Sequence, residues 1–182
     1  MINTLSLFKR IVLISIFLLT NYNYSQSLKD YSFENYKTGK VKAKTKAKIN
    51  YSSNPTATEY KTRIKNEYKN GKINFASYYI TVTWGCGSAC VSGAMIDTRD
   101  GKVYDLPLDE STYLYGCDLN EDFILYKDFS RLFISIYCTE VGIENSDDYY
   151  LEKTYFINEW NEKEKKFILI NTLKERIKVE NK

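Results

Sequence analysis

Three strand–turn–strand patterns follow one another in the second half of the chain, and they limit the fold more than any other feature. Residues 75–84 (FASYYITVTW) open this region with a run of aromatic and β-branched side chains, which favour strands. The turns that follow recur about every 30 residues. The pattern predicts a mainly β protein of the α+β class, built as an antiparallel meander or sandwich of β-hairpins. Three such units are too few for a closed propeller.

Each hairpin has two predicted strands and a polar turn. The three pairs are Val91–Asp97 with Lys102–Leu106, Phe123–Tyr126 with Leu132–Cys138, and Tyr149–Asn158 with Lys166–Asn171. In the first turn, Gly101 supplies the positive φ that a tight reversal requires. Residues 172–182 (TLKERIKVENK) are highly charged and predict a short helix or a tail.

One N-terminal helix is predicted before the strands. The Asn-Pro pair at residues 54–55 marks a turn, and Thr56 or Thr58 then caps a helix that continues to about Lys69. Apolar residues recur along it with helical spacing: Ala57, Tyr60, Ile64 and Tyr68. Gly71 ends the helix.

Residues 1–25 have the order of a secretory signal peptide. The positive pair Lys9-Arg10 is followed by an apolar run, Ile11–Leu19. That run is about half as long as a membrane span, so an uncleaved anchor is the alternative that we do not favour. Cleavage after Ser25 or Ser27 would leave no other long apolar segment. We therefore expect a soluble protein in the periplasm or outside the cell, without a membrane span.

The mature chain divides by composition into three parts. Residues 26–40 are polar and lack apolar periodicity, which predicts a flexible leader. Residues 41–172 contain the predicted helix and strands, so we expect them to form a single β-rich domain. Residues 173–182 are the predicted charged tail.

Lysines alternate strictly where the leader meets the domain: Lys40, Lys42, Lys44, Lys46 and Lys48. In a strand these side chains would project from one face. They would form either a basic arm for an anionic partner, such as lipopolysaccharide or nucleic acid, or a solvated edge strand whose charges block further pairing. We favour the edge strand. No aromatic or glycine-rich RNA signature accompanies the lysines, so no nucleic acid partner is expected.

The chain contains no histidine, which excludes Ser-His-Asp triads, Cys-His dyads and His-ligated zinc or haem. Carboxylates are plentiful, but no pattern selects two of them for acid–base catalysis. We therefore predict no catalytic residue, no cofactor and no metal site, and we favour a protein without enzymatic activity.

Four cysteines in an exported protein are expected to pair, and they allow three connectivities. We favour Cys86–Cys90, because a glycine between them permits a tight turn, together with Cys117–Cys138. A redox dithiol at Cys86 and Cys90 is the alternative, although catalytic disulfides usually enclose two residues at a helix N-terminus. A zinc site built from all four would need a different spacing.

Charge is unevenly distributed along the mature chain, although its net charge is only +1. Residues 105–164 carry 4 basic and 15 acidic residues, while the segments on both sides are basic. We therefore expect an acidic surface in the middle of the domain, which would attract a basic partner.

The candidate binding residues are the aromatic Tyr78 and Trp84 and the acidic Asp118, Asp122, Asp147 and Asp148. The spacing of Asp118 and Asp122 resembles the start of a calcium loop. However, Phe123 and Phe129 stand where such a loop requires glycine and glutamate, so an acidic turn is predicted instead.

The segment Asn54–Pro107 resembles a set of small, exported, uncharacterised bacterial proteins. The resemblance centres on a WGCG-x-x-C motif at Trp84–Cys90, followed by an apolar strand that ends in Asp97. In those proteins Gly-His follows a Phe-Ala pair, whereas this chain has Ser77-Tyr78. The resemblance implies an exported protein but brings no activity and no catalytic residue.

Together these features favour an exported binding or inhibitory module whose partner is basic, such as a lysozyme-like hydrolase or a toxin. Two alternatives stay open. One is a thiol–disulfide redox protein that uses Cys86 and Cys90, and the other is a carbohydrate-binding or surface-associated structural protein. The sequence does not indicate the oligomeric state.

Overall fold

The computed structural model describes residues 27–39, 46–87, 90–108 and 123–180. The chain divides into two compact units after Asp30. In the first unit, the described residues form a short 3-10 helix, η1 (Leu28–Asp30), and the Asp30 carboxylate accepts a hydrogen bond of 2.7 Å from the Ser27 N–H. Both sheets belong to the second unit.

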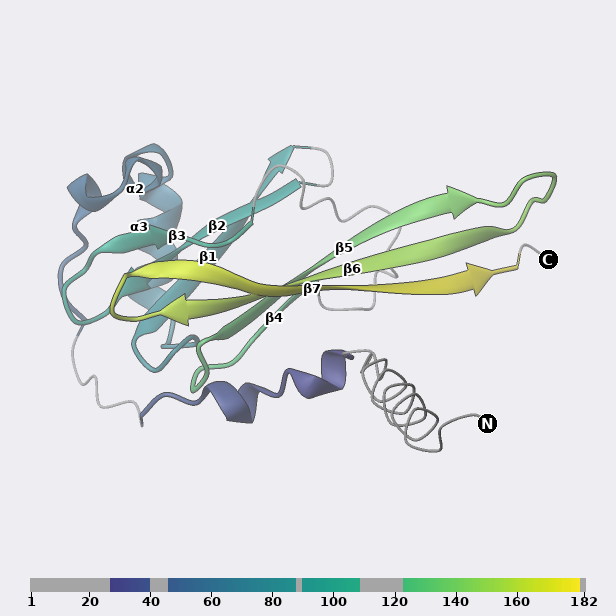
Figure 1. The fold of residues 1–182 in the computed structure, drawn as a ribbon. Coiled ribbons are helices and arrows are strands. Elements are labelled where there is room, and N and C mark those ends of the chain that lie inside the picture. Colours follow the sequence, from purple (N-terminus) through teal and green to yellow (C-terminus); the bar gives the residue numbers. More distant parts are fainter. Residues whose placement is uncertain (1–26, 40–45, 88–89, 109–122, 181–182) are drawn as a thin grey trace, which may run out of the picture. The chain divides into compact units, whose positions relative to one another are not determined.

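The second unit contains two antiparallel sheets, each formed by strands in chain order (Figure 1). The first sheet consists of β1 (Tyr79–Gly87), β2 (Cys90–Asp97) and β3 (Val103–Asp105). The second consists of β4 (Ile124–Tyr126), β5 (Leu132–Gly142), β6 (Tyr149–Asn161) and β7 (Lys166–Val179). The predicted mainly β fold is therefore confirmed, as two successive meanders of hairpins.

The turn between β2 and β3 shows why a glycine is needed at its end. Gly101 has a φ of 76° and donates its N–H to the Asp97 carbonyl over 2.8 Å. A Cβ atom at this position would lie 2.0 Å from the carbonyl oxygen of Lys48. Any other residue would therefore suffer both an unfavourable φ and a backbone clash.

Two consecutive helices replace the single predicted one: α2 (Pro55–Glu59) and α3 (Lys61–Asn70). The N-cap is Asn54, whose side chain accepts the Thr56 N–H over 2.7 Å, so the predicted threonine cap is wrong. The helices meet at Tyr60, whose ψ of 28° departs from helical geometry. The predicted end at Gly71 is confirmed.

Strand boundaries differ from the predictions in three places. Residues 75–78 form a turn, with positive φ at Ala76 (44°) and Ser77 (65°), so β1 begins only at Tyr79. At the C-terminus, β7 continues to Val179, which corrects the predicted helix or tail over most of residues 173–182. Residues 46–49 are not a strand, which corrects the described part of the predicted lysine-rich edge strand; residues 40–45 lie outside the described residues.

The start of the second unit lies along the turn between β4 and β5. It contains the 3-10 helix η2 (Phe33–Tyr36), and a β-bridge joins Lys37 to Ser130. The Thr38 N–H donates to the Phe129 carbonyl over 2.8 Å. A third 3-10 helix, η3 (Tyr51–Ser53), precedes α2. Part of the expected leader, 26–40, thus makes backbone hydrogen bonds to the second sheet.

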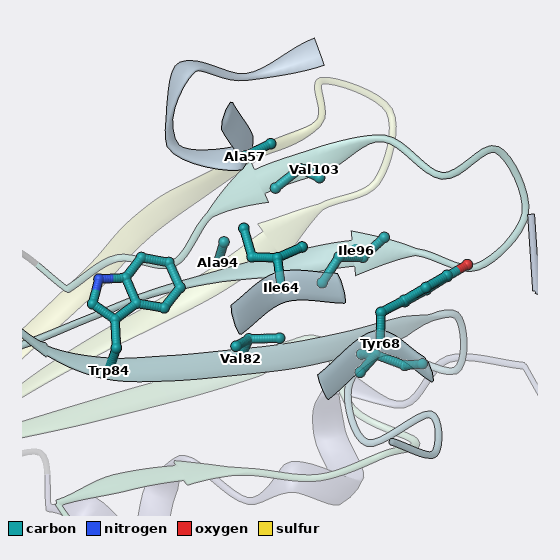
Figure 2. Close-up of a cluster of buried hydrophobic side chains, with 9 residues drawn as sticks. Ala57, Ile64, Tyr68, Val82, Trp84, Ala94, Ile96 and Val103 are labelled. Carbon is teal, nitrogen blue, oxygen red and sulfur yellow. The ribbon is translucent and has the colours of Figure 1, made fainter. Parts of the chain in front are cut away.

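Successive side chains along a strand point to opposite faces of a sheet. The first sheet therefore contributes buried side chains to two clusters, one on each face. One face packs against α2 and α3, and Figure 2 shows Ile64 of α3 in the middle of this cluster, between Trp84 and Tyr68. The other face packs against the second sheet. That second cluster consists of Phe75, Ala76, Tyr79, Met95, Leu106, Leu108, Phe133 and Trp160.

Candidate functional site

The turn between β5 and β6 lies beside the C-terminal end of β7, at one end of the second sheet (Figure 1). Residues 140–151 and 177–180 form this end, which we call the acidic tip. It carries five carboxylates and one cation, Lys178. The carboxylates belong to Glu140, Glu144, Asp147, Asp148 and Glu180.

The turn of the acidic tip has a defined backbone. Asn145 adopts a positive φ of 58°, a conformation that asparagine tolerates better than most residues. The Ser146 N–H donates to the Ile143 carbonyl over 3.2 Å, and the Ser146 hydroxyl accepts the Asp148 N–H over 3.0 Å. These hydrogen bonds fix the backbone conformation of the turn and therefore the positions from which its side chains project.

The single cation of the acidic tip is shared between two carboxylates. Lys178 Nζ lies 3.0 Å from Asp148 and 3.4 Å from Glu180, and the hydrogen bond to Asp148 raises the pKa of Lys178. Glu140 and Glu144 are exposed, and neither side chain has a partner within the described residues. The tip therefore keeps an excess of negative charge.

Apolar side chains lie next to these charges. Val141 is 37% exposed and Ile177 is 39% exposed. Leu151 is the cross-strand neighbour of both Glu140 and Ile177, so the three side chains form one row on the same face of the sheet. A surface that combines exposed apolar groups with unpaired charge is suited to protein contacts.

Away from the tip, some of the described acidic residues of 105–164 are neutralised by nearby basic residues. Glu152 lies 2.8 Å from Lys174 and 2.7 Å from Arg176, and hydrogen bonds from these two residues lower the pKa of Glu152. Arg131 pairs with Glu159 over 3.0 Å. Among the described residues of 105–164, the count of acidic residues thus overstates the acidic surface, because Arg131 and the basic residues of β7 lie beside two of them.

The structure brings only some of the predicted binding residues together. Asp147 and Asp148 lie in the acidic tip, whereas Asp118 and Asp122 lie outside the described residues. Tyr78 is half-buried, and the Arg99 guanidinium carbon lies 4.1 Å from its ring centroid. Trp84 is a core residue that is 4% exposed and stacks on Tyr60 at 4.3 Å, so it offers little surface to a partner.

The predicted disulfide Cys86–Cys90 is present, with a Cα–Cα distance of 5.1 Å. It lies where β1 and β2 join, and Cys90 is the antiparallel partner of Gly87. Both cysteines belong to strands rather than to a helix N-terminus. Cys138 is buried in β5, and its expected partner Cys117 lies outside the described residues, so that pairing stays a prediction.

A polar network that the sequence did not reveal joins the two sheets. The Tyr79 hydroxyl donates to Glu162 over 2.7 Å, and it accepts from Arg99 at 3.1 Å and Lys165 at 2.9 Å. Asp97, which is 1% exposed, is held by Arg99 over 2.5 Å. A second positively charged group, Lys165 Nζ, lies 3.4 Å from the Asp97 carboxylate.

The electrostatics of this network indicate a structural role. Burial opposes ionisation of Glu162, but hydrogen bonds from Lys165, Tyr79 and Arg99 outweigh it and lower the pKa of Glu162 to about 2. Burial, together with the bond to Glu162, raises the pKa of Tyr79. Every charged group of the network thus has a partner of opposite charge: Arg99 and Lys165 each lie next to both Asp97 and Glu162.

Comparison of the chain with protein-family models, curated proteins and solved structures gives no match. The resemblance of Asn54–Pro107 to exported bacterial proteins therefore stays a prediction. Within the described ranges, no helix combines the length and apolar character needed to cross a membrane.

Proposed function

We propose that this protein is an exported binding or inhibitory module that recognises a basic protein, such as a cationic hydrolase or toxin, through the acidic tip. The observation that carries this proposal is the pair of exposed carboxylates, Glu140 and Glu144, which no cation within the described part of the chain neutralises. A basic partner would supply the missing charge. Export is supported by the Cys86–Cys90 disulfide, which is typical of oxidising compartments.

The apolar groups of the tip add the second element of such an interface. Ile177, which lies in the same row as Glu140, would be removed from water by a partner, while Glu140 and Glu144 would steer the encounter. Steering by charge is strongest at low ionic strength, where the Debye length is about 30 Å at 0.01 M salt. Binding to a basic partner should therefore weaken as salt is added.

The test measures binding to, and inhibition of, a cationic lysozyme at low salt by calorimetry and activity assay. The variant Glu140→Gln/Glu144→Gln removes two carboxylates from the tip. Its matched control, Glu59→Gln/Asp128→Asn, removes two exposed carboxylates from α2 and from the β4–β5 turn. Both variants have the same net charge, so a difference between them reports the position of the charge.

We expect the tip variant to bind about tenfold more weakly and the control variant to bind like the unmodified protein. Equal weakening in both variants would show that only net charge matters and would overturn the assignment of the tip. An absence of binding at low salt to every basic protein tested would overturn the proposed function itself.

A further inference from the structure

A pocket of 530 Å³ lies between helix α3 and the segment 46–51, in a part of the second unit that the proposed function does not use. One wall is the face of α3 that carries Lys61, Lys65 and Lys69, at intervals of four residues. The opposite wall includes Lys48 and Ile49. Its size falls within the range of small-molecule sites.

Hydrogen bonds hold the two walls in place. The Tyr68 hydroxyl of α3 donates to the Ala47 carbonyl over 2.9 Å. The Ala47 N–H in turn donates to the Thr98 carbonyl over 2.9 Å, and the Asn50 N–H donates to the Gly101 carbonyl over 2.9 Å. In Figure 2 the Tyr68 hydroxyl points away from the apolar cluster, in agreement with this bond. The pocket is therefore preformed.

One of the lining lysines has a structural task. Lys46 Nζ donates to the carbonyl oxygens of Tyr68 at 2.5 Å and Gly71 at 2.6 Å, at the C-terminal end of α3. These carbonyls lack partners within the helix and carry its negative dipole end, so a cation is well placed there. The Lys46 ammonium group is thus already bound to the end of the helix. A ligand of the pocket would instead meet the ammonium groups of the other four lysines.

Those remaining lysines are not neutralised. Lys48, Lys61, Lys65 and Lys69 are exposed, and none of them forms an ion pair with a residue that the structure describes. No carboxylate within the described ranges lines the pocket. Like charges four residues apart on a helix repel each other. The fold therefore holds four ammonium groups around one pocket at a cost that a bound anion would relieve.

The interior of the pocket is apolar and aromatic. It is formed by Tyr51 and Tyr68, with Ala47 and Ile49 beside them. Lys61 Nζ lies 5.0 Å from the ring centroid of Tyr51, a cation–π contact that places this ammonium group beside the aromatic side chain. A ligand that fits would place an apolar or ring-shaped body against the tyrosines and an anionic group among the lysines.

We propose that this pocket binds a small phosphate ester with an apolar or ring-shaped body. A phosphate monoester carries nearly two negative charges at neutral pH, and lysine binds phosphate as a compact point charge. The pocket has four ammonium groups and no lining carboxylate among the described residues. It therefore suits a ligand with two negative charges better than a ligand with one carboxylate group. The body supplies the apolar contact that inorganic phosphate lacks. This site is separate from the acidic tip and does not depend on the proposed function.

The test uses 1-naphthyl phosphate as probe, with inorganic phosphate and 1-naphthol as the two halves of the ligand. Affinities are measured by calorimetry with the full mature chain at low salt. We expect 1-naphthyl phosphate to bind at least about tenfold more tightly than either half, because only the whole molecule uses both the lysines and the tyrosines. The affinity should fall as salt is added.

Paired variants locate the site. Lys65→Gln/Lys69→Gln removes two charges from the pocket, and Lys127→Gln/Lys163→Gln removes two exposed lysines from turns of the second sheet. We expect the first variant to lose about tenfold in affinity for 1-naphthyl phosphate and the second to lose less than about twofold. Because all four side chains are exposed, both variants should fold, and a thermal melt confirms it.

Several outcomes would overturn the assignment. Equal affinity for inorganic phosphate and 1-naphthyl phosphate would indicate a simple anion surface without a use for the tyrosines. Equal loss in the two variants would place the binding elsewhere. Binding of a heparin or oligonucleotide chain that 1-naphthyl phosphate does not displace would show that the lysines belong to a surface for polyanions.

Discussion

The Tyr79 hydroxyl of β1 donates a 2.7 Å hydrogen bond to the Glu162 carboxylate, which lies in the turn after β6. This bond crosses between the two sheets, and 83 residues separate its partners in the chain. Arg99 reaches the same carboxylate over 2.5 Å from the turn that follows β2. The packing of the two meanders is thus specified by polar groups as well as by apolar burial.

Tyr79→Phe should destabilise the protein by about 1–3 kcal/mol, because the hydroxyl is buried and its donors and acceptor would lose a partner. Tyr104→Phe is the matched control. Tyr104 belongs to the same aromatic group, with its ring centroid 5.3 Å from that of Trp160, but its hydroxyl has no hydrogen bond within the described residues. Urea unfolding measures both variants. Similar losses would show that the network does not stabilise the fold.

The low pKa of Glu162 predicts a pH dependence. Because the folded state lowers this pKa from 4.5 to about 2, it favours the ionised form. The resulting stabilisation is complete above pH 4.5 and is lost as the pH falls towards 2. Glu162→Gln should therefore reduce the slope of unfolding free energy against pH in that window.

The control for this experiment is Glu144→Gln, which removes an exposed carboxylate without a partner in the described part of the chain. Urea unfolding curves recorded at several pH values between 2 and 5 should show the same slope in this variant as in the unmodified protein. If the slope of Glu162→Gln is also unchanged, the network does not govern acid unfolding.

The sequence predicted the hairpins well and their ends poorly, for a physical reason. A run of aromatic and β-branched residues indicates a buried strand, as in β1, whose side chains contribute to the apolar clusters on both faces of the first sheet. In contrast, β7 is an edge strand with charged residues in its second half, and its conformation depends on pairing with β6. At Ala76 and Ser77, tertiary contacts override strand propensity, because the Ala76 N–H donates to Ser130 over 3.2 Å.

The candidate sites were predictable only in part. Asp147 and Asp148 stood out as an acidic turn, and the spacing of Lys61, Lys65 and Lys69 is visible on a helix. However, neutralisation of Glu152 depends on Lys174, which is 22 residues away and lies beside it only through strand pairing. Likewise, Lys48 joins the α3 lysines only because the segment 46–51 lies against that helix.

The two tryptophans provide a paired test of hydrogen bonding in the core. Trp84 and Trp160 are both buried, but the Trp84 Nε1 atom has no partner in the described part of the chain, whereas that of Trp160 donates to Glu162 over 2.8 Å. Both changes to Phe remove similar apolar area. Trp160→Phe should therefore cost about 1.5–3 kcal/mol more than Trp84→Phe, as measured by urea unfolding. Equal costs would indicate that Trp84 has a partner of its own.

The Cys86–Cys90 disulfide should be a modest stabiliser. It closes a loop of only five residues, for which chain entropy gives about 2 kcal/mol. Cys86→Ala/Cys90→Ala should reduce the free energy of unfolding by no more than that amount. In the native unmodified protein this disulfide should resist mild reduction. Rapid, reversible reduction, followed by thiol titration, would instead favour the redox alternative.

Repulsion among the lysines on one face of α3 should lower the free energy of unfolding of the protein. Lys65 lies four residues from both Lys61 and Lys69, and each such like-charge pair destabilises a helix by roughly 0.2–0.5 kcal/mol. Lys65→Gln relieves both pairs while keeping helix propensity, so the free energy of unfolding should rise by about 0.4–1 kcal/mol at low salt. Lys72→Gln, beyond the end of the helix, is the control and should change little.

The gain of Lys65→Gln should disappear at high salt, where the repulsion is screened. A loss of stability in Lys65→Gln would show instead that this ammonium group has a favourable structural contact, and the repulsion argued for the pocket would not hold.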